Sequence, residues 1–261
     1  MTIDLNGNTI ERDGRGFALA ITDGANVTLK NGTVTSPYRA AAVSNGATLT
    51  IESGNYNSGD CGIQVNNDGH LVVNDGNFNT QEFGVIVFDE GSTVEINGGE
   101  FTSIDNAVIG GNGSAGRGGT TITINGGTFH GNITSNGYIA CGVYHPNEGT
   151  LIINGGTFDV QNGVGILVRG GDVTINDVTV NTTGNVQGKV GDSRILTGCS
   201  ALYVDGVSTY PGWNSCHVTV KGGTFTSEVD PVTITVPEGE DKADRLAIEG
   251  GIFNDETDIS F

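Results

Sequence analysis

Apolar residues alternate with polar ones in short runs, and glycine, asparagine and aspartate separate the runs. This alternation is the two-residue period of half-buried β-strands, and no long stretch carries the 3.6-residue period of an amphipathic helix. The phrase Thr150–Phe158 (TLIINGGTF) shows the pattern clearly, because alternating apolar residues lead into a glycine turn and an aromatic residue follows. The chain is therefore predicted to be all-β.

Variants of this phrase recur along the whole chain. The second glycine of the turn falls at Gly32, Gly54 and Gly76, 22 residues apart, and wider spacings later indicate insertions. Self-similarity at a fixed period indicates a solenoid. Three short strands and three turns per period predict a parallel β-helix of about nine to ten coils of roughly 22 residues. We expect residues 1–261 to form one such domain, with residues 1–16 as a first half-coil.

Two columns of equivalent positions define the predicted core. The position three before the second turn glycine is aliphatic in every repeat, and the position two after it is aromatic in seven of nine. Strands of neighbouring coils lie about 4.8 Å apart, so these side chains stack, and the rings add offset stacking to burial. Asparagines between the two columns are expected to form an amide ladder; they are Asn74, Asn97, Asn125, Asn154 and Asn176.

Charge excludes one class of partner. The formal net charge is −19, and the 11 lysines and arginines do not cluster. Because phosphate neutralisation needs clustered basic side chains, nucleic acid is not an expected partner. No apolar run is long enough to span a membrane, so no membrane insertion is expected.

Four scattered cysteines do not form a disulfide framework. Cys61 and Cys141 begin apolar strands and are interpreted as buried thiols. Cys199 and Cys216 flank one loop, so a disulfide between them is an alternative to two further free thiols.

Insertions concentrate in the C-terminal half, and binding residues usually lie on loops held by a rigid scaffold. Two insertions leave after the third strands of coils five and seven, so they should flank coil six. We expect a shallow recess there, near Asp159, Gln161 and Asn162. The insertions are predicted at residues 110–119, 131–137, 183–197, 206–215 and 238–244.

The strongest single candidate is the run Tyr210-Pro211-Gly212-Trp213-Asn214, which holds the only tryptophan. Aromatic rings beside an amide suit stacking on sugar faces, so Tyr210, Trp213 and Asn214 are candidate glycan-binding residues. The alternative is that Trp213 folds down and covers the side of the solenoid.

An acid or asparagine precedes glycine at a series of equivalent turns. Stacked carboxylates could hold Ca²⁺, but Asp-Gly is also ordinary turn chemistry and no dense acidic cluster occurs. We interpret these positions as solvated turns, and neither a metal site nor a cofactor is assigned. The positions are Asp23, Asn45, Asp68, Glu90, Glu148, Asp205 and Glu238.

The periodicity and the repeated NGGTF phrase resemble the right-handed parallel β-helix (pectin-lyase-like) superfamily. More narrowly, they resemble repeat proteins of gut-bacterial surfaces and of the virions of their phages. The superfamily includes polysaccharide lyases, tailspike hydrolases and adhesins, so the resemblance implies a right-handed solenoid and leaves the activity open. Polygalacturonase signatures are absent, since Arg194-Ile195 is followed by Leu196.

Two arrangements would support catalysis. Arg169 and Asp172 lie near one turn, as in a lyase, but no second basic residue accompanies them. A hydrolase needs two carboxylates about 5–9 Å apart, for which Asp159 with Asp172 or Glu148 are the candidates. Nothing in the sequence distinguishes these acids from their neighbours, and no catalytic residue is assigned.

The sequence therefore favours a non-catalytic, extracellular β-helix that serves as a structural or adhesive module. The protein would be located in a phage virion, as capsid decoration, head fibre or tail component, or on a bacterial cell surface. The absence of an export signal at Met1 favours the virion. The expected partners are a glycan or a host-surface or virion protein, and open ends favour association of copies. A polysaccharide lyase or tailspike-type glycoside hydrolase is the alternative.

Overall fold

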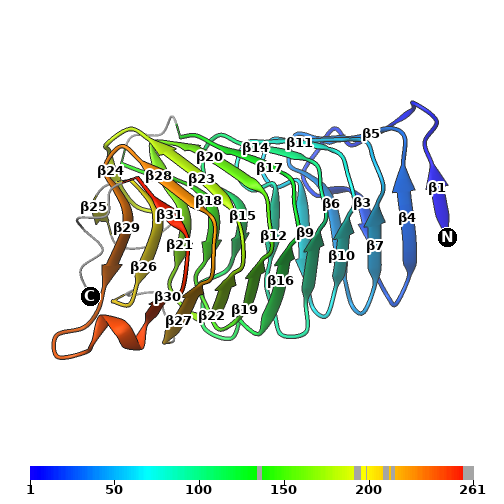
Figure 1. Ribbon diagram of the computed structural model, residues 1–261. Helices are drawn as coiled ribbons and strands as arrows, with labels where there is room; N and C mark the ends of the chain where they lie inside the picture. The colour runs from blue at the N-terminus through cyan, green and yellow to red at the C-terminus, as the bar shows by residue number, and fades with distance from the viewer. Residues whose placement is uncertain (134–136, 191–194, 198, 208–211, 213–214, 255–261) are drawn as a thin grey trace.

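The computed structural model describes residues 1–133, 137–190, 195–197, 199–207, 212 and 215–254. Three parallel sheets run along the rod, and the chain enters them in turn once per coil (Figure 1). Sheets A and B each contain ten described strands and sheet C contains nine. The predicted parallel β-helix of about ten coils is confirmed.

Each sheet collects one strand from every coil. Sheet A contains β1 (Thr2–Asp4), β4 (Asn26–Lys30), β7 (Thr48–Ile51), β10 (His70–Val73), β13 (Thr93–Ile96), β16 (Thr120–Ile124), β19 (Gly149–Ile153), β22 (Gly171–Ile175), β27 (Cys216–Val220) and β30 (Leu246–Ile248). Sheet B contains β2 (Thr9–Glu11), β5 (Thr33–Ser36), β8 (Asn55–Ser58), β11 (Asn77–Thr80), β14 (Glu100–Ser103), β17 (Thr128–Gly131), β20 (Thr157–Gln161), β23 (Thr179–Thr183), β28 (Thr224–Ser227) and β31 (Ile252–Phe253). Sheet C contains β3 (Phe17–Ile21), β6 (Arg39–Ser44), β9 (Ile63–Asn66), β12 (Val85–Val87), β15 (Ala107–Gly111), β18 (Ala140–His145), β21 (Gly163–Val168), β26 (Ser200–Asp205) and β29 (Asp230–Thr235).

Two short elements lie outside these sheets. An antiparallel pair joins β24 (Gln187–Gly188) to β25 (Leu196–Thr197) inside one insertion. A 3₁₀ helix, η1 (Lys242–Asp244), lies in the insertion predicted at residues 238–244. No helix among the described residues is long and apolar enough to cross a membrane.

The predicted core columns are confirmed residue by residue. In sheet A, Leu29, Ile51 and Val73 pair in register and are buried. In sheet B the aromatic residues stack with ring centroids 4.3–5.1 Å apart and planes within 15°, which is the geometry of offset ring stacking. The ladder contains two continuous runs, Tyr56–Phe78–Phe101–Phe129–Phe158 and Phe225–Phe253.

The turn between sheets A and B, which we call corner A–B, requires glycine where the coils approach each other. Gly127 has φ of +111°, and a Cβ there would lie 3.1 Å from the Gly99 carbonyl oxygen of the preceding coil. A side chain would therefore meet both backbone strain and a steric clash. Val178 replaces this glycine in coil seven, where the ring ladder is also interrupted by Val180.

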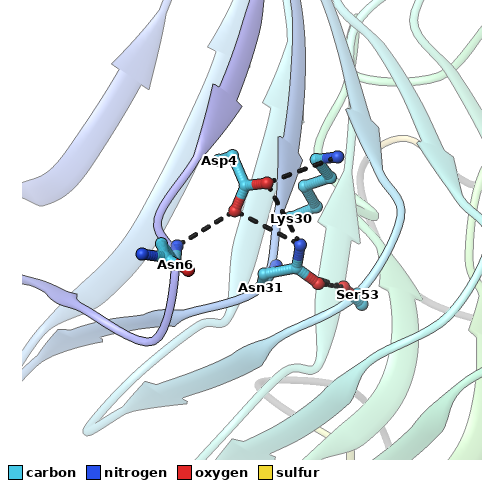
Figure 2. A network of polar contacts seen from close by, with 5 residues as sticks. All are labelled: Asp4, Asn6, Lys30, Asn31 and Ser53. Atoms are coloured by element: carbon cyan, nitrogen blue, oxygen red, sulfur yellow. Dashed lines mark hydrogen bonds and ion pairs between the residues drawn. The ribbon is translucent and has the colours of Figure 1, made fainter.

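The predicted amide ladder also exists at corner A–B. Each asparagine Nδ2 donates to the side-chain oxygen of the preceding coil, with 2.7 Å from Asn125 to Asn97, and the series ends on the Glu52 carboxylate, which accepts from Asn74 at 3.0 Å. The first coil is tied to this corner by a related network (Figure 2). There Asp4 accepts from Asn31 at 3.2 Å and pairs with Lys30 at 3.3 Å. These exposed contacts align neighbouring coils.

The insertions of coils five and seven cover part of the outer face of sheet C, a role that the sequence did not predict. A β-bridge joins Tyr138, directly after the coil-five insertion, to Lys189 in the coil-seven insertion, and Ile139 donates its backbone N–H to the Lys189 carbonyl at 3.2 Å. The insertions thus meet over coil six. They enclose a second hydrophobic cluster against outward-facing residues of sheet C; its members include Ile139, Tyr144, Leu167, Val190, Leu196 and Tyr203.

The cysteines are all buried and free. Cys61 and Cys141 are buried thiols, as predicted, and burial raises the pKa of both. The alternative prediction of a Cys199–Cys216 disulfide is wrong. Cys199 directly precedes β26 of sheet C, whereas Cys216 begins β27 of sheet A, so the two lie on different sides of the solenoid.

Candidate functional site

The insertions at the turn between sheets C and A, corner C–A, are held together by Asn147. Its Nδ2 donates to the carbonyls of Asn112 at 3.1 Å and Ser114 at 2.9 Å. Gly212 from the later insertion donates to the Gly113 carbonyl at 2.8 Å. The glycine-rich segment at residues 110–119 is therefore fixed on both sides, and it can shape a site.

An open hollow of about 340 Å³ lies at this corner. Its walls are the exposed Glu90 and Glu148, one coil on either side of the glycine-rich segment, and its remaining lining is glycine backbone. Gly118 packs so closely that a Cβ there would lie 2.4 Å from Glu148 Cγ, and a Cβ on Gly119 would lie 3.1 Å from Glu90 Cγ. Side chains are thus excluded between the two carboxylates.

The edge of the hollow is braced by a pinned arginine. Arg117 donates to Asp89 Oδ1 at 2.6 Å, and its guanidinium lies 5.3 Å from the centroid of the Phe88 ring. Both contacts fix the guanidinium beside Asp89 and Phe88. The hollow is therefore lined by acidic and backbone groups, with the neighbouring cation already engaged.

His145 lies behind the hollow. It lines a narrower inner gap that shares Gly118 and Glu148 with the hollow and is too small for a water molecule. His145 is 2% exposed, its Nε2 has no hydrogen-bond partner among the described residues, and its imidazole hydrogen-bonds the Gly149 backbone. Burial lowers the pKa of the imidazole to about 4, so it is neutral at pH 7.

This depressed pKa predicts acid sensitivity. The folded-state pKa of about 4 lies below the unfolded value of about 6.5, so the unfolded chain binds the proton first. The contribution of neutral His145 to the free energy of unfolding is therefore fully present above about pH 6.5. It is lost as the pH falls towards 4, which lowers the free energy of unfolding by about 3 kcal/mol. We expect urea unfolding of His145→Asn to show a smaller difference between pH 7.5 and 4.5 than the wild type. The half-exposed His130, changed to asparagine, is the control; an unchanged pH difference in His145→Asn would contradict the prediction.

The residues predicted on coil six lie on or beside sheet B. Asp159, in β20, accepts from Asn181 Nδ2 at 2.9 Å and lies 3.7 Å from His130 Nδ1. Gln161 is exposed at the end of the same strand, and Asn162 forms the one-residue turn into β21 with φ of +56°. The flanking insertions meet above this turn, and glycan binding by these three residues stays a prediction. Tyr210, Trp213 and Asn214 lie outside the described residues.

Arg169 and Asp172, the pair considered for a lyase, do not come together. Arg169 is fully buried, where its Nε donates to Asp205 Oδ2 at 2.8 Å and its Nη1 to the Tyr144 hydroxyl at 3.2 Å. Asp172 is exposed instead and lies 3.2 Å from His217 Nδ1. Asp205, interpreted from the sequence as a solvated turn residue, is thus wrongly assigned, because it is the buried partner of an arginine.

Sequence reasoning missed the hollow between Glu90 and Glu148. The signal was present as two Glu-Gly turns on either side of an insertion rich in glycine. Within the described ranges, no group of three or more histidine, cysteine, aspartate or glutamate side chains could hold a metal ion.

Comparison with known proteins gives no match: no family model fits the chain, and no curated protein or solved structure resembles it significantly.

Proposed function

We propose that this protein is a non-catalytic, extracellular β-helix that serves as a structural and adhesive rod and binds extended glycans along one face. Its setting would be a phage virion or a bacterial surface, as the resemblance to the pectin-lyase-like superfamily and to NGGTF-repeat surface proteins suggests. The possible partners are a glycan or a host-surface or virion protein. Association of copies of the chain through the ends of the solenoid belongs to the same proposal.

The observation that carries this proposal is the outer face of sheet B. Two columns of mostly short polar side chains follow the strands in register through nine coils. Some neighbours within a column are hydrogen-bonded, as by Asn77 Nδ2 to Asn55 Oδ1 at 3.2 Å and by Asn181 Nδ2 to Asp159 Oδ1 at 2.9 Å. We call these columns the polar face; they are Thr9, Thr33, Asn55, Asn77, Glu100, Thr128, Thr157, Thr179 and Thr224, beside Glu11, Thr35, Asn57, Asn79, Thr102, His130, Asp159, Asn181 and Thr226.

The geometry of this face suits a polymer. Coils repeat about every 4.8 Å, so hydroxyl, amide and carboxylate groups recur at a fixed spacing along the rod. An extended sugar chain presents hydroxyl groups that can donate hydrogen bonds to such groups and accept hydrogen bonds from them. On binding, these hydrogen bonds replace hydrogen bonds to water, so a sugar that matches the spacing is bound in preference to one that does not. A long flat face offers many weak contacts, which favours adhesion to a polymer over enclosure of a small molecule.

The test is glycan-array binding of the wild type and of two matched variants. Thr102→Arg places a long side chain on the polar face, and Thr123→Arg places the same side chain on the outer face of sheet A. We expect Thr102→Arg to weaken binding of the retained glycans at least tenfold, a difference of about 1.4 kcal/mol. Thr123→Arg should bind as the wild type does. Equal losses in both variants would reject the polar face as the binding surface.

The polysaccharide-degrading alternative is checked on the same glycans by reducing-sugar and unsaturated-uronide assays. A non-catalytic rod yields no turnover. Sustained product formation that Asp159→Asn abolishes would contradict the non-catalytic proposal. It would show that the protein degrades the glycan and that Asp159 belongs to the catalytic machinery.

A further inference from the structure

The polar face presents no lysine or arginine. Among the described residues of its two columns, the acids are Glu11, Glu100 and Asp159, and His130 is the one further titratable group. The chain as a whole carries a formal net charge of −19 with histidine counted as neutral. A ligand that lies along this face therefore meets hydroxyl, amide and carboxylate groups, with a single imidazole among them.

The basic side chains of the described part of the chain are engaged elsewhere or lie off this face. Arg12 directly follows β2, and its Nε turns to the adjoining loop, where it donates to the Arg15 carbonyl at 2.8 Å. No lysine or arginine of the described residues forms an ion pair with an acid of the polar face. Five basic side chains pair instead with other carboxylates; they are Lys30, Arg39, Arg117, Arg169 and Arg245.

Two acids of the polar face lie close together near the middle of the rod. The strands β14, β17 and β20 follow one another in sheet B (Figure 1), and they carry Glu100, His130 and Asp159. His130 Nε2 lies 3.9 Å from Glu100 Oε1, and His130 Nδ1 lies 3.7 Å from Asp159 Oδ2. The side chains of Glu100 and Asp159 are 62% and 44% exposed, so both carboxylates are open to a ligand on the face.

Carboxylates in this position select against an anionic ligand for two reasons. An ionised carboxylate only accepts hydrogen bonds, and so does a sugar carboxylate or sulfate, so the two groups cannot pair when water is displaced. A sugar anion above His130 would also lie about one coil spacing, roughly 4.8 Å, from each acid, which is within the screening length of about 8 Å at physiological salt. The hydroxyl groups of an uncharged sugar, in contrast, donate to carboxylates and to amide oxygens alike.

We propose that the polar face binds extended uncharged glycans and rejects polyanionic ones, and that Glu100 and Asp159 determine this selectivity. The inference rests on the proposed function, because it names the class of glycan for the same face. Threonine and asparagine side chains supply the repeated contacts, and the two carboxylates act as repulsive groups against the wrong ligand, a common source of specificity.

The experiment measures binding of the intact chain to matched polymers at pH 8 and low salt. The probes are mixed-linkage β-glucan and galactomannan, each as the neutral polymer and in its carboxymethylated form. We expect the wild type to retain the neutral form and to bind the carboxymethylated form at least tenfold more weakly. Added salt should narrow this ratio, because exposed charges are screened.

Two double variants with the same change of charge locate the selectivity. Glu100→Gln/Asp159→Asn replaces the two acids by amides of nearly equal size and should narrow the ratio between the neutral and carboxymethylated forms at least threefold. The matched control is Glu95→Gln/Asp172→Asn, because both of these acids are exposed on the outer face of sheet A. The control should keep the wild-type ratio.

The possible failures are distinguishable. Equal binding of the neutral and carboxymethylated forms by the wild type would overturn the inference and leave glycan adhesion standing. An unchanged ratio in Glu100→Gln/Asp159→Asn, or the same narrowing in the control variant, would overturn the role of these two acids. If the wild type retains neither form of either polymer and no glycan on the array, the proposed function itself fails, and the inference fails with it.

Discussion

Asp205→Ala is expected to lower the free energy of unfolding by about 3–5 kcal/mol. Asp205 and Arg169 are both fully buried, and their 2.8 Å contact compensates the guanidinium charge inside the protein. Removal of the carboxylate would leave that charge without its counter-charge in a low-dielectric environment, and desolvation would no longer be offset. The loss should appear as a lower urea midpoint.

Two variants separate charge from packing in this pair. Asp172→Ala removes an aspartate whose side chain is 79% exposed, so it should change stability by less than about 0.5 kcal/mol. The double variant Arg169→Met/Asp205→Leu removes both charges and should recover most of the loss, because apolar replacements of a buried ion pair are often neutral. If Asp205→Ala alone proves as mild as Asp172→Ala, the buried pair does not stabilise the fold as argued.

Phe129→Ala is expected to cost about 3–5 kcal/mol, the range for truncation of a buried phenylalanine. Phe129 is fully buried and stacks at 5.1 Å on Phe101 and at 4.4 Å on Phe158. A solenoid is held by contacts between neighbouring coils, so a cavity in coil five weakens two interfaces at once. Urea unfolding should therefore shift to lower concentration and can separate into two steps.

The control for this variant is the adjacent Thr128→Ala, whose side chain points outward from the same strand and should cost well under 1 kcal/mol. A single sharp transition at the wild-type midpoint in Phe129→Ala would show that the ring ladder contributes little to the cohesion of the coils.

The repeating part of the molecule could be predicted because one period determines it. Ile124 and Phe129 recur at fixed distances from a turn glycine, and parallel pairing places equivalent positions one above another. The amide ladder followed for the same reason, since Asn97 and Asn125 occupy the same register. No knowledge of loop conformation was needed.

The insertions could not be placed in the same way, because their contacts depend on loop conformations that have no period. A signal was nevertheless present in sheet C, where β18, β21 and β26 lack the polar alternation of the other strands and are buried on both faces. Strands with two apolar faces need a cover, and the insertions supply it. Asp205 was misassigned because an Asp-Gly pair looks the same in the sequence whether the aspartate lies in an exposed turn or beside a buried arginine.

The amide ladder has a consequence beyond alignment of the coils. Every asparagine donates towards the amino-terminal end, from Asn176 through Asn154 to Asn125, and the series finishes on the negative charge of Glu52. The amide dipoles therefore add along the corner, and each polarises the next. An extended molecule lying along this corner would meet a different order of donors and acceptors in its two orientations. A rod of nearly identical coils thus distinguishes one direction along its length from the other.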